Sequence, residues 1–100
     1  MSVRQQELAL VVLTGRLDVS TVSVVRERLH AAVDAGTGLL VVDLSGVQSV
    51  DVTGLGMLAG TYRRAQAAGR TMVLRAVSPR VARLLHVTRL DRVLPMEDVG

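Results

Sequence analysis

Short runs of apolar residues alternate along this chain with stretches in which apolar residues recur every three or four positions. Residues 8–13, 39–42 and 71–74 are apolar or nearly apolar runs of strand length, and such runs are typical of strands buried in a sheet. The first run closes at Thr14 and the second at Asp43, where we expect the strands to end. The second contains no polar residue, which favours a central strand covered on both faces.

Three other segments show helical spacing. The first begins near Ser20 and ends before Gly36, and the second spans residues 53–68 and ends at Gly69. The third begins at Ser78, a capping residue that is followed by proline at the first helical position. The apolar stripes of the three segments are Val22, Val25, Leu29 and Val33; Leu55, Leu58, Ala59, Tyr62 and Ala65; and Val81, Leu84 and Leu85. The sequence therefore predicts three amphipathic helices.

In chain order the predicted elements alternate strand and helix. Residues 2–6 are a candidate for a ragged edge strand, and residues 93–94 for a short last strand. Strand–helix–strand units with short links favour parallel strands. We therefore expect an α/β fold in which a mostly parallel four- to five-stranded sheet packs against helices. With 100 residues, of which 49% are hydrophobic, residues 1–100 are expected to form a single domain.

The positive charge of this chain comes entirely from arginine. The 12 basic residues are all Arg and stand against 9 acidic residues, for a formal net charge of +3. Because Tyr62 is the only aromatic residue, the stacking platforms used in nucleic-acid binding are missing. We expect no direct nucleic-acid partner and a mostly solvated arginine face in the second half of the chain, formed by Arg63, Arg64, Arg70, Arg75, Arg80, Arg83, Arg89 and Arg92.

Composition argues against several further classes of protein. The chain has no cysteine, and its two histidines, His30 and His86, are too far apart in sequence to form a metal motif. We therefore expect no metal and no cofactor. No apolar run approaches the roughly 18 residues of a membrane span, and the first residues do not have the pattern of a signal peptide. A cytoplasmic protein without membrane insertion is expected.

Residues 43–60 place a hydroxyl where a strand passes into a helix. Thr53 lies close to Asp51 and is followed by Gly54 and Gly56, which have no side chains to obstruct a partner. Backbone N–H groups and the helix dipole favour an anion at this position, and a phosphate would bring about −1.5 to −2 charges. The pattern indicates an accessible modification site. Spacing alone leaves a second interpretation open, an ordinary capping threonine with glycines that shape a turn.

Motifs of catalysis and of nucleotide binding do not fit this stretch. Asp43 ends a predicted central strand, as the acceptor of a phosphoaspartate receiver does, but a receiver also needs a lysine and the chain has none. Residues 54–60 read GLGMLAG, which is neither G-x-G-x-x-G nor a Walker loop. No motif of Ser/His/Asp nucleophilic catalysis is visible. We therefore assign no catalytic residue and expect a protein that is not an enzyme.

Three motifs follow one another in a specific order. Residues 15–18 read Gly-Arg-Leu-Asp, residues 41–45 read Val-Val-Asp-Leu-Ser, and residues 50–56 read Val-Asp-Val-Thr-Gly-Leu-Gly. On these motifs the chain resembles the anti-sigma factor antagonists of the STAS family, whose usual forms are G-x-L-D and D-S-[ST]-G-L-G. The likeness runs across nearly the whole chain and implies a STAS-like fold.

The resemblance also implies a role for Thr53. In the family, the hydroxyl residue directly before the glycine is the phosphorylation site, and Thr53 occupies that position here. The unphosphorylated protein is then expected to bind an anti-sigma factor with serine/threonine kinase activity. Phosphorylation of Thr53 would end the complex, and a protein phosphatase would reset it.

We expect the partner-binding surface to surround Thr53 on helix 53–68 and the loops beside it. Met57 is expected on the exposed face of this helix as an adaptable contact, with Thr61 on the same side. Asp18 completes the surface if it lies at the same edge of the sheet. The expected contact residues are Asp18, Asp51, Val52, Gly54, Gly56, Met57, Gly60 and Arg64.

The chain departs from the family pattern in two ways. Val52 stands where the family usually has serine, so Thr53 is the single acceptor hydroxyl of the motif. The segment before the first apolar run is also several residues shorter than is usual. Related STAS modules serve as docking subunits of membrane ABC transporter ATPases or as scaffold components of stress-sensing complexes, and these two functions stay open as alternatives.

Overall fold

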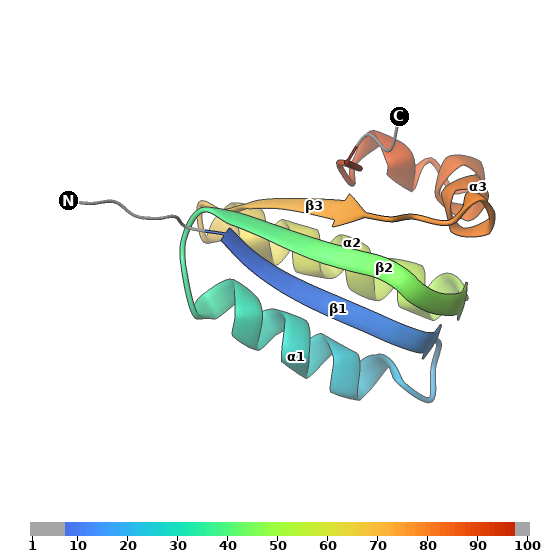
Figure 1. Ribbon diagram of the computed structural model, residues 1–100, viewed down its shortest axis with the longest axis horizontal. Helices are drawn as coiled ribbons and strands as arrows, with labels where there is room; N and C mark the ends of the chain where they lie inside the picture. Colours follow the sequence, from blue (N-terminus) through green and yellow to red (C-terminus); the bar gives the residue numbers. More distant parts are fainter. Residues whose placement is uncertain (1–7, 98–100) are drawn as a thin grey trace.

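The computed structural model describes residues 8–97 and has a three-stranded sheet with helices packed beside it (Figure 1). The strands are β1 (Leu8–Leu17), β2 (Leu39–Val50) and β3 (Thr71–Arg75). The helices are α1 (Val22–Asp34), α2 (Val52–Ala67), α3 (Pro79–Val87) and the short 3₁₀ helix η1 (Leu90–Arg92). The strands are parallel in the order β1-β2-β3, which confirms the predicted α/β class.

Helices α1 and α2 pack against each other and against the same face of the sheet. Two crossovers that advance in the same direction place both helices on one side, because such crossovers are right-handed. The strand residues buried between helices and sheet are each at most 1% exposed: Leu13, Leu17, Leu40, Val42, Leu44, Met72 and Leu74. On the opposite face Leu10 and Val12 are 51% and 42% exposed, so the described helices leave that face of β1 uncovered.

The number of strands differs from the prediction. The described residues contain three strands, not four or five, and the candidate strand at residues 2–6 lies outside the described residues. The predicted strand at residues 93–94 is wrong. There the chain closes a helical turn, with the Leu94 N–H donating to the Leu90 carbonyl at 2.8 Å. Only afterwards does it meet β3, in a single parallel bridge between Met96 and Leu74.

Strands β1 and β2 are both longer than their apolar runs predict. The pairing continues through Thr14 opposite Gly46 to Leu17 opposite Val50, with register shifts on either side of Thr14 and Gly15. Gly46 permits the close approach, because a Cβ built on it would lie 2.7 Å from the Thr14 Cγ2 atom. The expectation that the strands end at Thr14 and Asp43 is therefore wrong. Bulges in the pairing let β2 continue through residues whose composition is typical of a turn.

Helix α3 begins as predicted. The Ser78 hydroxyl accepts a hydrogen bond from the Val81 N–H at 3.2 Å, and Pro79 occupies the first turn, where its missing N–H is not needed. Helix α2 begins one residue earlier than predicted, at Val52, with Asp51 as its N-cap. This start fixes the position of Thr53 within the first turn.

Arg70 is an exception to the expected solvated arginine face, because it is only 5% exposed. Its guanidinium donates hydrogen bonds to the carbonyl oxygens of Ala32 at 2.7 Å, Thr37 at 3.1 Å and Gly38 at 3.2 Å. These carbonyls belong to the end of α1 and the turn after it, where the helix dipole is negative. The prediction that Arg70 is solvated is wrong, and its charge instead joins α1 to the start of β3.

Candidate functional site

The carboxyl ends of β1 and β2 lie side by side and carry the residues predicted to surround Thr53. Because the strands are parallel, Leu17 pairs with Val50, and the Asp51 N–H donates to the Leu17 carbonyl at 3.1 Å. Asp18 and Asp51, the residues that follow, therefore lie at one edge of the sheet. The expectation that Asp18 shares the edge of Thr53 is confirmed.

Asp51, and not Thr53, caps helix α2. The Oδ1 atom of Asp51 accepts a hydrogen bond from the Gly54 N–H at 2.9 Å. Thr53 is the second residue of the helix; its side chain is exposed, and its hydroxyl forms no hydrogen bond with any residue of 8–97. The interpretation of Thr53 as an ordinary capping threonine is therefore wrong. Its hydroxyl is accessible and has no structural partner in this part of the chain.

The turn after β1 is organised by Asp18. Its Oδ1 atom accepts hydrogen bonds from the Ser20 hydroxyl at 2.6 Å and the Ser20 N–H at 3.0 Å. These bonds, together with the nearby Arg16 guanidinium, lower the pKa of the Asp18 carboxyl below its usual value, with the Ser20 hydroxyl as the largest cause. Asp18 thus presents a fixed negative charge near the start of α2.

Two exposed valines lie at the same edge. Val52 is 80% exposed at the first position of α2, and Val19 is 74% exposed in the turn after Asp18. Val19 was not among the predicted contact residues, and a lone apolar residue in a turn carries no periodic signal by which a sequence pattern identifies it. We refer to Asp18, Val19, Asp51, Val52 and Thr53 together as the Thr53 edge, a surface that combines a free hydroxyl, two carboxylates and two apolar side chains.

Gly54 is buried under the Thr53 edge and does not belong to its surface. A Cβ built on it would lie 2.3 Å from the Leu17 carbonyl oxygen, a distance that no side chain tolerates. Gly54 therefore sets how closely α2 approaches the end of β1, and its prediction as a contact residue is wrong. Gly56 and Gly60 lie on the outer face of α2, where an added Cβ would meet nothing within 4 Å.

Replacement of Gly54 by alanine is expected to destabilise the fold by about 1–3 kcal/mol, because the methyl group forces α2 away from the Leu17 backbone. The matched control is Gly56→Ala in the same helix, which faces open space and is expected to stabilise the helix by about 0.5–1 kcal/mol. Urea unfolding of both variants measures the difference. Equal stability of the two alanine variants would contradict the role assigned to Gly54.

Met57 and Thr61 lie inside the protein and not on the predicted exposed face. Met57 is 3% exposed and Thr61 is 0% exposed. The Thr61 hydroxyl donates to the Met57 carbonyl at 2.9 Å, which satisfies it within the helix. Helix α2 packs against both α1 and the sheet, and Met57 belongs to the hydrophobic core between them. The prediction of Met57 as an adaptable surface contact is therefore wrong.

Arg64 is exposed on α2 but lies far from Thr53. Eleven residues separate the two, which corresponds to roughly 16 Å along a helix. Its guanidinium donates to both carboxylate oxygens of Asp34 on α1, at 2.7 and 3.2 Å. These bonds lower the pKa of Asp34 and raise that of Arg64. The arrangement makes Arg64 a link between the ends of two helices, distant from the Thr53 edge.

Asp43, a candidate acceptor in the sequence, also has structural partners. Asp43, in the middle of β2, accepts the Ser45 N–H at 2.8 Å and lies 3.5 Å from the Arg75 Nε atom. The Ser45 bonds are the main cause that lowers the pKa of Asp43. Within residues 8–97 no three His, Asp or Glu side chains are grouped closely enough to hold a metal ion. None of the helices in this range is long and apolar enough to cross a membrane.

Comparison with known proteins assigns this arrangement to a family. The family described as "Mlab, STAS domain" matches residues 1–96, and the chain belongs to the STAS-domain family of anti-sigma factor antagonists. It is similar to the anti-sigma-B factor antagonist of Bacillus subtilis strain 168, with 32% identity over 82 residues that cover 82% of this chain and 74% of that protein. The anti-sigma-B factor antagonist of Staphylococcus aureus strain NCTC 8325 is 32% identical over 84 residues, with 84% and 78% coverage.

Solved structures agree with this assignment. An anti-sigma factor antagonist from Mycobacterium paratuberculosis superposes with a TM-score of 0.83 at 27% identity, over 96% of this chain and 81% of that one. The anti-sigma factor antagonist SpoIIAA in its unphosphorylated form superposes with a TM-score of 0.74 at 20% identity, over 98% and 86%. At that lower identity the likeness to SpoIIAA concerns the fold, which is the STAS-like fold expected from the sequence.

Proposed function

We propose that this protein is a regulatory anti-sigma factor antagonist without enzymatic activity, which acts in the bacterial cytoplasm through the Thr53 edge. The observation that carries the proposal is the exposed hydroxyl of Thr53, which has no partner within residues 8–97 while Asp51 caps the helix. A hydroxyl in this situation has no structural task and is open to a kinase. The names of the curated relatives, anti-sigma-B factor antagonists, supply the class of partner.

The unphosphorylated protein binds an anti-sigma factor that has serine/threonine kinase activity. Val19 and Val52, which are both largely exposed, offer apolar contacts to such a partner, and Asp18 offers a fixed charge. The Thr53 edge is a small surface, but a standard interface takes only about 800 Å² from each partner. The helix α2 face that carries Gly56 and Gly60 adjoins the edge and extends the available area.

Phosphorylation of Thr53 ends this complex. The phosphate adds about −1.5 to −2 charges next to the carboxylates of Asp18 and Asp51, so three anionic groups would then occupy one edge. A partner that fits the unmodified edge has no additional cation to pair with this charge. Burial of the unpaired charge in the interface costs several kcal/mol. A protein phosphatase that removes the group restores binding.

The proposal is tested by incubating the protein with ATP and the anti-sigma factor kinase proposed as its partner, followed by mass spectrometry of the peptide that contains residues 50–60. We expect one phosphate on Thr53 and none in Thr53→Ala. Thr71→Ala, which removes an exposed threonine at the opposite end of the strands, serves as the control and is expected to remain phosphorylated. A wild-type protein without phosphate on Thr53 would overturn the phosphorylation switch.

A further inference from the structure

The region formed by α3 and η1 carries positive charge that the described chain does not neutralise. Four exposed arginines lie on it and make no hydrogen bond or ion pair through their side chains with any residue of 8–97: Arg80, Arg83, Arg89 and Arg92. Three exposed arginines elsewhere differ in this respect. Arg16, Arg64 and Arg75 each lie within 4 Å of a carboxylate, those of Asp18, Asp34 and Asp43 respectively.

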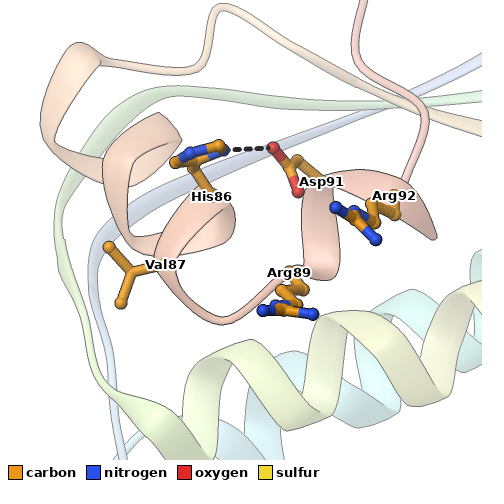
Figure 2. Close-up of a pocket in the computed structure, with 5 residues that line it drawn as sticks. All are labelled: His86, Val87, Arg89, Asp91 and Arg92. Atoms are coloured by element: carbon orange, nitrogen blue, oxygen red, sulfur yellow. Dashed lines mark hydrogen bonds and ion pairs between the residues drawn. The ribbon is translucent and has the colours of Figure 1, made fainter.

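Two of these arginines line a pocket of about 330 Å³ together with His86, Val87 and Asp91 (Figure 2). The carboxylate of Asp91 is already engaged, because its Oδ2 atom lies 3.0 Å from the His86 Nδ1 atom. Figure 2 marks no bond between Asp91 and the guanidinium groups of Arg89 and Arg92. The pocket therefore offers two guanidinium groups, which match the geometry of a carboxylate.

The backbone at Arg89 is held in an unfavourable conformation. Its φ of +64° and ψ of 15° lie in the left-handed region, which costs a non-glycine residue about 1–2 kcal/mol. Hydrogen bonds fix the turn on both sides, from the Arg89 N–H to the His86 carbonyl at 3.0 Å and from the Arg92 N–H to the Arg89 carbonyl at 3.3 Å. Glycine would adopt this turn at lower cost, so a change of Arg89 to glycine removes the side chain without disturbing the turn.

The pocket lies at the end of the molecule that also carries the Thr53 edge. Figure 1 places α3 where β2 passes into α2, and in Figure 2 the side chain of Arg89 faces α2. The two surfaces have opposite charge, since the Thr53 edge carries Asp18 and Asp51 and the pocket carries the two arginines. A partner that covers both is held in one orientation by charge complementarity.

We propose that the α3–η1 pocket binds an acidic segment of the protein partner, with its carboxylates between Arg89 and Arg92. The identity of this partner rests on the proposed function. The rim of the pocket supports a protein ligand, because Val87 is 70% exposed beside the arginines and arginine next to apolar side chains is typical of protein interfaces. Nucleic acid fits less well, since the described chain has a single aromatic residue, Tyr62, and it lies on α2.

The inference is tested with the variants Arg89→Gly and Arg92→Gln, alone and combined. We expect the double variant to bind the anti-sigma factor about tenfold or more weakly, with a weaker dependence on salt concentration than the wild type. Arg89→Gly is expected to raise the melting temperature, because glycine relieves the left-handed turn. Arg26→Gln removes an exposed charge from α1 and is expected to leave the affinity unchanged. An unchanged affinity of the double variant would overturn the inference while the function of Thr53 still stands.

A second measurement does not depend on the partner. Hexaglutamate added to the wild-type protein at low salt is expected to shift the backbone amide NMR signals of residues 86–92, and the shifts are expected to disappear in the double variant. A wild type that fails to bind the anti-sigma factor contradicts the proposed function. In that case the hexaglutamate titration alone tests whether the α3–η1 pocket binds carboxylates. Shifts that persist in the double variant, or that are absent from the wild type, would exclude a carboxylate site at Arg89 and Arg92.

Discussion

Phosphorylated Thr53 is expected to bind the anti-sigma factor more than about a hundredfold less tightly than the unmodified protein, a difference of about 2.7 kcal/mol. The reason is local. The new charge stands in the first turn of α2, beside the Asp51 carboxylate that already accepts the Gly54 N–H, and it adjoins Asp18. Isothermal titration calorimetry with the separately purified forms measures the change. The Thr53→Asp variant adds a smaller charge and is expected to lose about tenfold or more.

Two control variants separate charge from position in that experiment. Thr53→Ala removes only the hydroxyl and is expected to retain the affinity of the unmodified protein within a few-fold. Gln66→Glu adds one negative charge to the same helix at an exposed site, roughly 20 Å further along, and is expected to have no effect. Equal affinity of Thr53→Asp and Thr53→Ala would contradict the switch and favour the alternative of a docking subunit on an ABC transporter ATPase.

The position of Thr53 at the start of a helix could be predicted from the sequence. Which residues of that helix are buried and which are exposed could not. Thr53 and Met57 are four residues apart and so lie on the same side of an isolated helix. Thr53 is nevertheless exposed, whereas Met57 belongs to the buried core, since α2 packs against both α1 and the sheet. Helical periodicity gives the centre of the buried stripe, here Leu58, whereas its width depends on the neighbouring helix.

The ends of β1 and β2 could not be predicted from the sequence for a related reason. In β2 the buried apolar residues beyond Asp43 are Leu44, Val47 and Val50, which are three residues apart and do not show the two-residue period of a regular strand. The register shifts opposite Thr14 and Gly15 account for this spacing. Irregular pairing of this kind is a property of two strands together, so neither strand alone reveals it.

Arg70 shows the limit of composition as a guide to burial. In sequence it is one of eight arginines in a basic half, and nothing in its neighbours Gly69 and Thr71 distinguishes it from those that are solvated. Its burial depends on the end of α1, which is more than 30 residues away in the chain and whose last carbonyls need donors. Such long-range pairing of a cation with a helix terminus has no local sequence pattern.

Replacement of Arg70 by methionine is expected to lower the free energy of unfolding by about 1–3 kcal/mol, because partly buried carbonyl oxygens then lose their donors. The side chain of methionine fills much the same volume, so the loss reports on hydrogen bonding more than on packing. Arg70→Lys keeps the charge but has one ammonium group where the guanidinium reaches the carbonyls of Ala32, Thr37 and Gly38, and its loss is expected to be intermediate.

Urea unfolding followed by circular dichroism measures these losses, with Arg63→Met as the control. Arg63 is exposed on α2, and surface substitutions of this kind usually change stability by no more than about 0.5 kcal/mol. Because Arg70 lies at the opposite end of the sheet from the Thr53 edge, the folded fraction of Arg70→Met is expected to bind the anti-sigma factor normally. An Arg70→Met protein as stable as Arg63→Met would show that water replaces the guanidinium without loss, and that the end of α1 does not need the arginine.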